Sequence, residues 1–111
     1  MITSIEHVNR VIPLLVDRIK EKYEPEKIIL FGSYAYGKPD KSSDIDLLII
    51  KDTDKPFYKR WAEVCRIVSD LRYCIPFSPF VFTPNEWENK IEKHDPFFLE
   101  ILEKGKILYA R

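Results

Sequence analysis

Four residues in the first half of the chain have the types and the spacing needed to hold a metal ion against a phosphate. Gly32 and Ser33 follow the apolar run Ile28–Phe31, and Asp44 and Asp46 occupy alternate positions where a second apolar run begins. Successive side chains of a strand point to opposite faces, so both carboxylates would project from one face, about 6–7 Å apart. Mg²⁺ is typically held by one or two carboxylates together with substrate phosphates. The spacing therefore predicts a metal site formed by Asp44 and Asp46.

The turn between the two runs is expected to supply the phosphate contacts. Because Gly32 has no Cβ, backbone N–H groups and the Ser33 hydroxyl can come close to a polyphosphate. Lys38 and Lys41 flank this turn and could steer a triphosphate, although a lysine in a loop is most often simply solvated. A glycine-serine turn or an Asp-x-Asp pair alone is usually ordinary structure. Their combination on two successive apolar runs favours a binding site.

The same residues carry a resemblance to a known family. The segments 30–37 and 43–49 resemble the minimal nucleotidyltransferase (MNT) domains, which belong to the superfamily related to DNA polymerase beta. The segments 82–84 and 105–109 are also similar to later parts of that family. The resemblance implies an α+β fold in which a small mixed β-sheet packs against helices, with residues 1–111 forming one nucleotidyltransferase-like domain.

The resemblance also implies a chemistry and a partner. AMP would be transferred from ATP, or a nucleotide from another NTP, with Asp44 and Asp46 acting as catalytic metal ligands and with Gly32 and Ser33 holding the outer phosphates. Two cations about 3.5–4 Å apart would stabilise the attacking and leaving oxygens. MNT domains are commonly paired with HEPN-domain proteins as antitoxin and toxin. The implied acceptor is a tyrosine hydroxyl of such a HEPN partner.

Two departures from the family pattern bear on catalysis. The family usually carries a third catalytic Asp, and here the matching position holds Ser78, whose neutral hydroxyl cannot replace a carboxylate as a base or match its charge as a metal ligand. Tyr36 stands where antitoxin relatives often have Arg, so a phosphate-pairing cation is missing. The nearby acidic alternatives, none of which matches the third position, are Asp52, Asp54 and Asp70.

Three functions remain open on this basis. The first is an active transferase that modifies a protein. The second is an antitoxin that binds a nucleotide or its partner without catalysis, which the missing third carboxylate favours. The third is a nucleotidyltransferase for a small molecule, although such enzymes usually carry an additional helical domain and this chain looks short for one.

Composition narrows the possible classes of function further. The chain has 111 residues, is 45% hydrophobic and has a formal net charge of zero, so it lacks the broad basic field of a non-specific nucleic-acid binder. No signal peptide and no apolar run of about 20 residues is visible, which makes the cytoplasm the expected location and a membrane partner unexpected. The two cysteines and two histidines are too scattered for a zinc site. The aromatic C-terminal half would also suit pairing with a second copy of this chain, although core packing explains it equally well.

Periodicity and capping residues predict the elements that position the site. A helix over residues 4–23 would begin with a capping box at Thr3 and contains Pro13, which either kinks it or starts a second helix. Further helices are predicted at 57–72, with Trp61 in the core rather than on a base-stacking surface, and after Thr83 and Asp95. The predicted strands are 27–31, 44–51, 77–82 and 106–109. Pro79 indicates an edge or a bulge in the third strand. The alternative for 106–109 is a tail that simply packs beneath the site. A helical turn is expected at 33–38, and Gly105 should end the last helix in the left-handed conformation.

Overall fold

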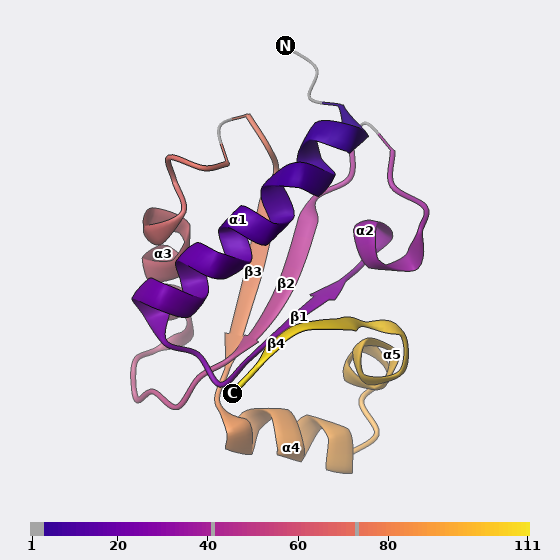
Figure 1. Ribbon diagram of the computed structural model, residues 1–111. Coiled ribbons are helices and arrows are strands. Elements are labelled where there is room, and N and C mark those ends of the chain that lie inside the picture. The colour runs from indigo at the N-terminus through magenta and orange to yellow at the C-terminus, as the bar shows by residue number, and fades with distance from the viewer. Residues whose placement is uncertain (1–3, 41, 73) are drawn as a thin grey trace.

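The computed structural model describes residues 4–40, 42–72 and 74–111, which form four strands and five helices. The strands are β1 (Lys27–Phe31), β2 (Ile45–Ile50), β3 (Phe77–Phe82) and β4 (Lys106–Ala110). The helices are α1 (Ile5–Tyr23), α2 (Ser33–Tyr36), α3 (Phe57–Ile67), α4 (Pro84–Glu92) and α5 (Pro96–Lys104). Figure 1 shows this arrangement as helices around one sheet, which is the α+β class expected from the sequence.

The sheet is mixed and has the strand order β3-β2-β1-β4. β1 pairs antiparallel with both β2 and β4, and β2 pairs parallel with β3. β3 is an edge strand, in agreement with the presence of Pro79, because proline cannot donate a hydrogen bond to a second neighbour. The segment 106–110 is a strand and not merely a packed tail. This order brings the end of β1 and the starts of β2 and β3 together at one end of the sheet.

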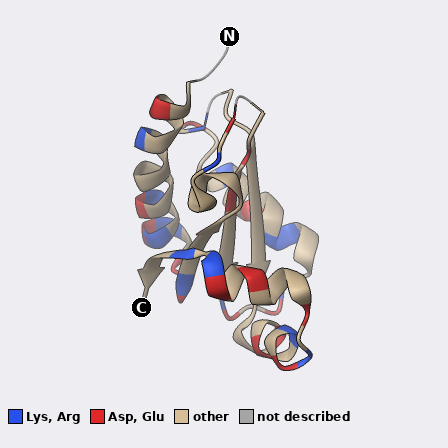
Figure 2. Ribbon diagram, turned by 90° about the vertical axis from the view of Figure 1, so that its right-hand side faces the viewer, with Lys and Arg blue, Asp and Glu red and all other residues tan. Residues whose placement is uncertain are grey.

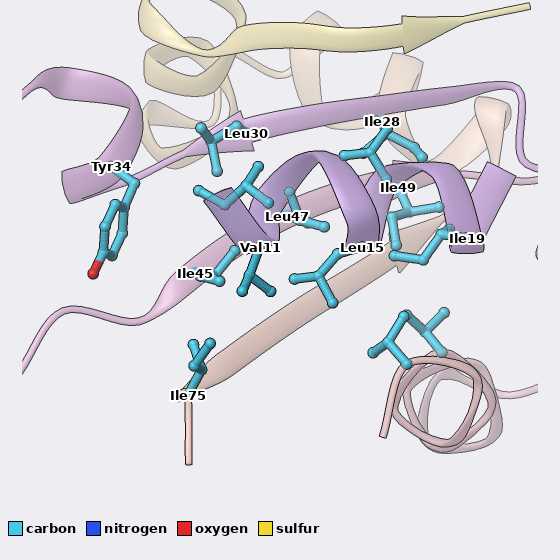
Figure 3. Packing of buried hydrophobic residues seen from close by; sticks show 14 of the residues in the cluster. Val11, Leu15, Ile19, Ile28, Leu30, Tyr34, Ile45, Leu47, Ile49 and Ile75 are labelled. Atoms are coloured by element: carbon cyan, nitrogen blue, oxygen red, sulfur yellow. The ribbon is translucent and has the colours of Figure 1, made fainter. Parts of the chain in front are cut away.

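One face of the sheet is covered by α1 and α3 and forms the larger core. Figure 3 shows Val11, Leu15 and Ile19 of α1 pointing at the strand residues Ile28, Leu30, Ile45, Leu47 and Ile49. These strand residues alternate along β1 and β2, as one face of a pleated sheet requires. Every one of these contacts is aliphatic.

The other face is covered by α4 and α5 and combines aliphatic with aromatic residues. Its buried residues are Ile29, Phe31, Leu48, Ile50, Phe98 and Ile101. Leu48 and Ile50 alternate with Leu47 and Ile49, so the continuous apolar run of β2 is covered on both faces, as the sequence predicted.

The first helix is continuous through Pro13. Its N-cap is Ser4, whose hydroxyl accepts a hydrogen bond from the backbone N–H of His7 at 3.0 Å; the predicted cap Thr3 lies outside the described residues. Of the two alternatives for Pro13, the structure has one helix, in which the carbonyl of Asn9 loses the partner that an N–H at position 13 would supply.

The third helix differs from its prediction at two points. It ends at Ile67 rather than at residue 72, and the Arg18 guanidinium of α1 donates to the Ile67 carbonyl at 3.0 Å where the chain continues in turns. Trp61 is 49% exposed and so is not a core residue. Arg60 is buried instead, with its guanidinium donating to the Val81 carbonyl and to the Glu86 carboxylate. A charged residue whose donors are satisfied has therefore displaced the tryptophan from the buried stripe.

The last two helices begin as predicted, but the prediction for Gly105 is wrong. Thr83 and Glu86 form a capping box at α4, and Asp95 caps α5. Gly105 has φ −66° and ψ 156°, which is extended and not left-handed. A Cβ at Gly105 would lie 2.5 Å from the Ile101 carbonyl oxygen. Glycine is thus required here because the chain passes close to the Ile101 carbonyl of α5 and to Ile29 of β1, rather than by its dihedral freedom.

Charge is distributed over the helices with both signs interspersed, while most of each strand is uncharged (Figure 2). Across residues 4–40, 42–72 and 74–111, no helix is both long enough and apolar enough to cross a membrane.

Candidate active site

The Gly32 turn connects β1 to the short helix α2 in a conformation that only glycine adopts readily. Its φ of 75° with ψ of −161° lies outside the regions open to other L-residues. A Cβ built on Gly32 would also lie 2.1 Å from the Asp46 Oδ2 atom. The Asp46 carboxylate therefore packs directly against the turn, and the missing side chain is what makes room for it.

The sheet register explains how three segments meet at this point. Asp46 is the antiparallel partner of Phe31 and the parallel partner of Ser78. Partners in a ladder share a face, so these side chains lie on the face covered by α4 and α5. Asp44 lies just before β2, and its carboxylate is held on the same side because it accepts a hydrogen bond from Ser78. The two carboxylates and the glycine-serine turn are consequently neighbours, as the spacing predicted.

Ser78 completes the cluster from the third strand. Its hydroxyl donates a hydrogen bond to the Asp44 Oδ2 atom at 3.0 Å. A neutral hydroxyl thus occupies the place next to both carboxylates, and it uses one acceptor site of Asp44. The three side chains Asp44, Asp46 and Ser78 form the polar end of an otherwise apolar face.

The comparisons with known proteins agree with this geometry. A family model described as "Nucleotidyltransferase domain" matches residues 12–109, which includes the turn and both carboxylates. The chain belongs to this nucleotidyltransferase family. It is 35% identical over 96 residues to a protein of Methanocaldococcus jannaschii named "Putative protein adenylyltransferase MJ0604", a match that covers 85% of this chain and 90% of the relative.

Two solved structures share the fold of this nucleotidyltransferase domain. A structure described as a nucleotidyltransferase from Sulfolobus solfataricus superposes with a TM-score of 0.62 at 17% identity, covering 92% of this chain and 79% of the other. A chain from a mutant of the MntA-HpeT toxin-antitoxin pair superposes with a TM-score of 0.60 at 18% identity, covering 89% of this chain and 72% of that one. At these identities the likeness shows the polymerase beta-like fold.

The electrostatics of the candidate site in this nucleotidyltransferase domain favour a bound cation. Burial raises the pKa of Asp46 to about 6, and the nearby charge of Asp44 adds to the rise. A carboxylate that is costly to ionise in the free protein gains most from a positive ligand. Both groups are only partly buried, so an ion could reach them from solvent.

The donor set fits one hard divalent cation better than two. Among the described residues, no group of three or more His, Cys, Asp or Glu side chains is placed to hold a metal ion. Asp44 and Asp46 alone suffice for a Mg²⁺ ion that keeps waters and takes its remaining ligands from substrate phosphates. A second ion would need further anionic ligands, and Ser78 does not supply one.

Tyr36 lies against the same turn. Burial raises the pKa of its hydroxyl, the charges of Glu100 and Asp46 add to the rise, and a hydrogen bond from the Gly32 backbone opposes it. The group therefore stays a neutral hydroxyl at physiological pH. Tyr36 contributes a hydrogen-bonding group and a wall to the site, and no positive charge.

The structure describes one of the two lysines that the sequence predicts near the turn. Lys38 follows Gly37, and its N–H donates to the Ser33 carbonyl at 3.1 Å. Its side chain lines an open hollow of about 500 Å³ together with Ala35, Tyr36 and Lys104. Lys41 lies outside the described residues. Lys104 was not anticipated, because its place beside α2 depends on how α5 packs and leaves no local mark in the sequence.

The other acidic candidates lie elsewhere. Asp52 and Asp54 follow β2 at the end opposite to Asp46. Asp70 pairs with Arg18 of α1, with Nη1 and Oδ1 2.8 Å apart, on the far side of the sheet. None of them replaces the missing carboxylate at Ser78. Cys65 lies on α3, which covers the opposite face of the sheet.

Proposed function

We propose that this chain, as one domain over residues 1–111, transfers AMP from ATP to a hydroxyl of a partner protein. In the proposal it is the antitoxin of a HEPN/MNT pair, with the HEPN toxin as acceptor and Mg²⁺ as cofactor. The family assignment supports nucleotidyl transfer. A relative named as a protein adenylyltransferase supports a protein acceptor, and a neighbour taken from a toxin-antitoxin structure supports a toxin partner.

The packing of Asp46 against Gly32 is the observation that carries this proposal. An ion held by Asp44 and Asp46 would lie beside the turn, and the Gly32 and Ser33 backbone would bind the outer phosphates that share that ion. The start of α2 leaves its first N–H groups without intrahelical acceptors, so they are available to phosphate oxygens. Lys38 and Lys41 would draw the triphosphate towards the turn. When bound, the Mg²⁺ would neutralise charge that develops on the transferred phosphoryl group.

A second candidate function rests on Ser78. A chain without a carboxylate at this position has no base beside Asp44 to take the proton of an attacking hydroxyl. Such a chain would still bind ATP and Mg²⁺ and would neutralise its partner by stoichiometric contact. In this second function the chain keeps its nucleotide-binding site but does not catalyse transfer.

Label transfer separates the two functions. The chain is purified with a co-expressed HEPN protein encoded beside it and incubated with ATP labelled at the α-phosphate and Mg²⁺. Appearance of label on the partner, and its loss in Asp44→Asn and Asp46→Asn, is the expected result. Asp54→Asn is the matched control, since this exposed carboxylate lies at the opposite end of β2.

Ser78→Asp sharpens the same experiment. A carboxylate at this position would stand beside Asp44 and Asp46 and could take up both the proton and a second ion. If the chain is a binding antitoxin, transfer should appear only in this variant. If the wild-type chain already transfers label, Ser78→Asp should change the rate without being required. Absence of ATP binding by the wild-type chain would sink both functions.

A further inference from the structure

Phe97 is an exposed aromatic side chain with a fixed orientation. It is the second residue of α5 and is 45% exposed. Its ring centroid lies 5.6 Å from that of Phe31 at an interplanar angle of 90°, and 5.3 Å from that of Phe98 at 85°. Phe80 adds a third contact at 6.3 Å. The ring is thus held by three neighbours while almost half of the residue remains open to solvent.

The neighbours of Phe97 place it beside the candidate active site. Phe31 is the ladder partner of Asp46. Phe80 is two residues after Ser78 on the same strand and the same face, about 6–7 Å further along. Both of these contacts of Phe97 are therefore adjacent to the polar cluster. The aromatic ring lies where the apolar part of the face gives way to the carboxylates.

The same helix reaches the other wall of the site with its last residue. Lys104 lines the same hollow as Tyr36 and Lys38, next to the Gly32 turn. Seven residues of α-helix separate Phe97 from Lys104, a rise of about 10 Å. One end of α5 is therefore aromatic and the other cationic, over a length that a nucleoside triphosphate can bridge.

We infer that the nucleobase of the bound nucleoside triphosphate stacks on the Phe97 ring. The phosphates would then be directed to the Gly32 turn, Lys38 and Lys104. This inference rests on the proposed function and adds a residue to it. A base has an aromatic face whatever its identity, so a stacking contact gives affinity with little choice between bases. Single exposed apolar residues are common on proteins. Phe97 differs from that background because ordered rings on the face that carries the carboxylates hold it in place.

Phe57 provides a matched control within the same chain. It is 46% exposed, and its ring lies 5.6 Å from that of Phe82 on the same sheet face. Phe82, however, is the last residue of β3, at the end opposite to Ser78. Replacing Phe57 therefore removes an aromatic ring of equal exposure from a place where no nucleotide is proposed to bind.

Calorimetric titration of the purified chain tests the inference with two probes, ATP with Mg²⁺ and tripolyphosphate with Mg²⁺. Phe97→Leu should weaken ATP binding by about tenfold or more and leave tripolyphosphate binding unchanged, because only ATP carries a base. Phe97→Trp should restore ATP binding, whereas Phe57→Leu should leave both probes unaffected. Thermal melting of each variant checks that the fold is retained.

The outcomes separate this inference from the function on which it rests. If wild-type protein binds ATP and Phe97→Leu binds it equally well, Phe97 does not stack on the base, while the nucleotide site remains. Equal weakening of ATP and tripolyphosphate would also overturn the stacking role, because the loss would then be structural. Loss of affinity for the partner protein alone would assign Phe97 to partner docking instead. Failure of the wild-type chain to bind either probe would remove the proposed function and this inference together.

Discussion

The two faces of the sheet are built from alternate residues of the same strands, yet they differ in what covers them. The face under α1 and α3 is aliphatic along its whole length, from Ile45 to Ile49 on β2. The opposite face begins with Asp44 and Asp46, and only then becomes apolar under α4 and α5. Because side chains alternate, each face can be specified without changing the other.

This difference separates stability from binding. A continuous aliphatic face gains free energy from burial and positions the backbone of β1 and β2. The apolar part of the face under α4 and α5 ends short of the two carboxylates, which remain partly open, and burial gives the Asp46 carboxylate an electrostatic cost in the free protein. The cost is tolerated because the other face fixes the strands. Substitutions on the two faces should therefore act in opposite ways, and the predictions below test this from the largest effect to the smallest.

Leu15→Ala should give the largest loss of stability. Leu15 is fully buried against the aliphatic face, with 0% exposure, and truncation of such a residue costs about 2–5 kcal/mol of unfolding free energy. Leu14, the neighbouring residue on α1, is 52% exposed, so Leu14→Ala should change stability by less than about 0.5 kcal/mol. Urea denaturation measures both. Nucleotide binding per folded molecule should be unchanged, and a selective loss of binding in Leu15→Ala would contradict the division between the faces.

Asp46→Asn should act in the opposite direction. Removal of this proposed metal ligand is expected to lower the rate of nucleotidyl transfer by about 100-fold or more. If the chain catalyses no transfer, ATP binding should fall instead. Unfolding free energy at neutral pH should rise, because the variant no longer holds in the fold an ionised carboxylate whose pKa is raised to about 6. Allowing for solvent screening of a partly exposed group, the gain is about 1–2 kcal/mol. A variant that loses both stability and binding would show instead that Asp46 is structural.

Gly32→Ala and Gly37→Ala separate dihedral strain from crowding at the site. Both glycines have positive φ, 75° and 80°, so alanine at either position should cost about 1–3 kcal/mol. Only at Gly32 would the new Cβ meet the Asp46 carboxylate, since nothing lies within 4 Å of a Cβ at Gly37. Chemical denaturation should show the larger loss for Gly32→Ala, because Gly37, with ψ of 16°, is in the left-handed region that other residues can enter, whereas Gly32, with ψ of −161°, is not. ATP binding should fail in Gly32→Ala alone, and equal binding by both would mean that Asp46 can move aside without loss.

Local patterns were sufficient to predict the strands and the helix starts. Alternation and apolar runs predicted β1 and β3 with their observed bounds, and the capping residues Thr83 and Asp95 mark where α4 and α5 begin. The adjacency of the glycine-serine turn and the carboxylates also followed, because two successive strands that pair antiparallel bring these segments together. These are features that short stretches of sequence determine.

Features that depend on distant partners could not be predicted in the same way. Arg60 is buried in place of Trp61 because Glu86, 26 residues later, satisfies its guanidinium. The extended Gly105 reflects contact with Ile101 and the β1 strand, which no local rule distinguishes from a left-handed cap. The position of Phe97 beside Phe31 likewise depends on how α5 packs. The candidate site was therefore predictable where it is made of β1 and β2, and not where α5 is proposed to complete it.

The smallest expected effect concerns the difference in unfolding free energy between wild type and Asp46→Asn, and how this difference changes with pH. The folded-state pKa of about 6 lies above the ordinary value of 3.8, so between these values the native state holds more protons than the unfolded state. The contribution of Asp46 to the free energy of unfolding therefore falls as pH rises through this window, and the full cost is present above it. The Asn variant should be more stable near neutral pH and should lose that advantage progressively towards pH 4. Asp70 and Glu86, whose pKa values are lowered, pair with Arg18 and Arg60, so they titrate alike in both proteins and cancel in the difference. Denaturation curves at several pH values measure this, and a difference that stays constant between about pH 4 and pH 7 would mean that the Asp46 charge carries no cost in the fold.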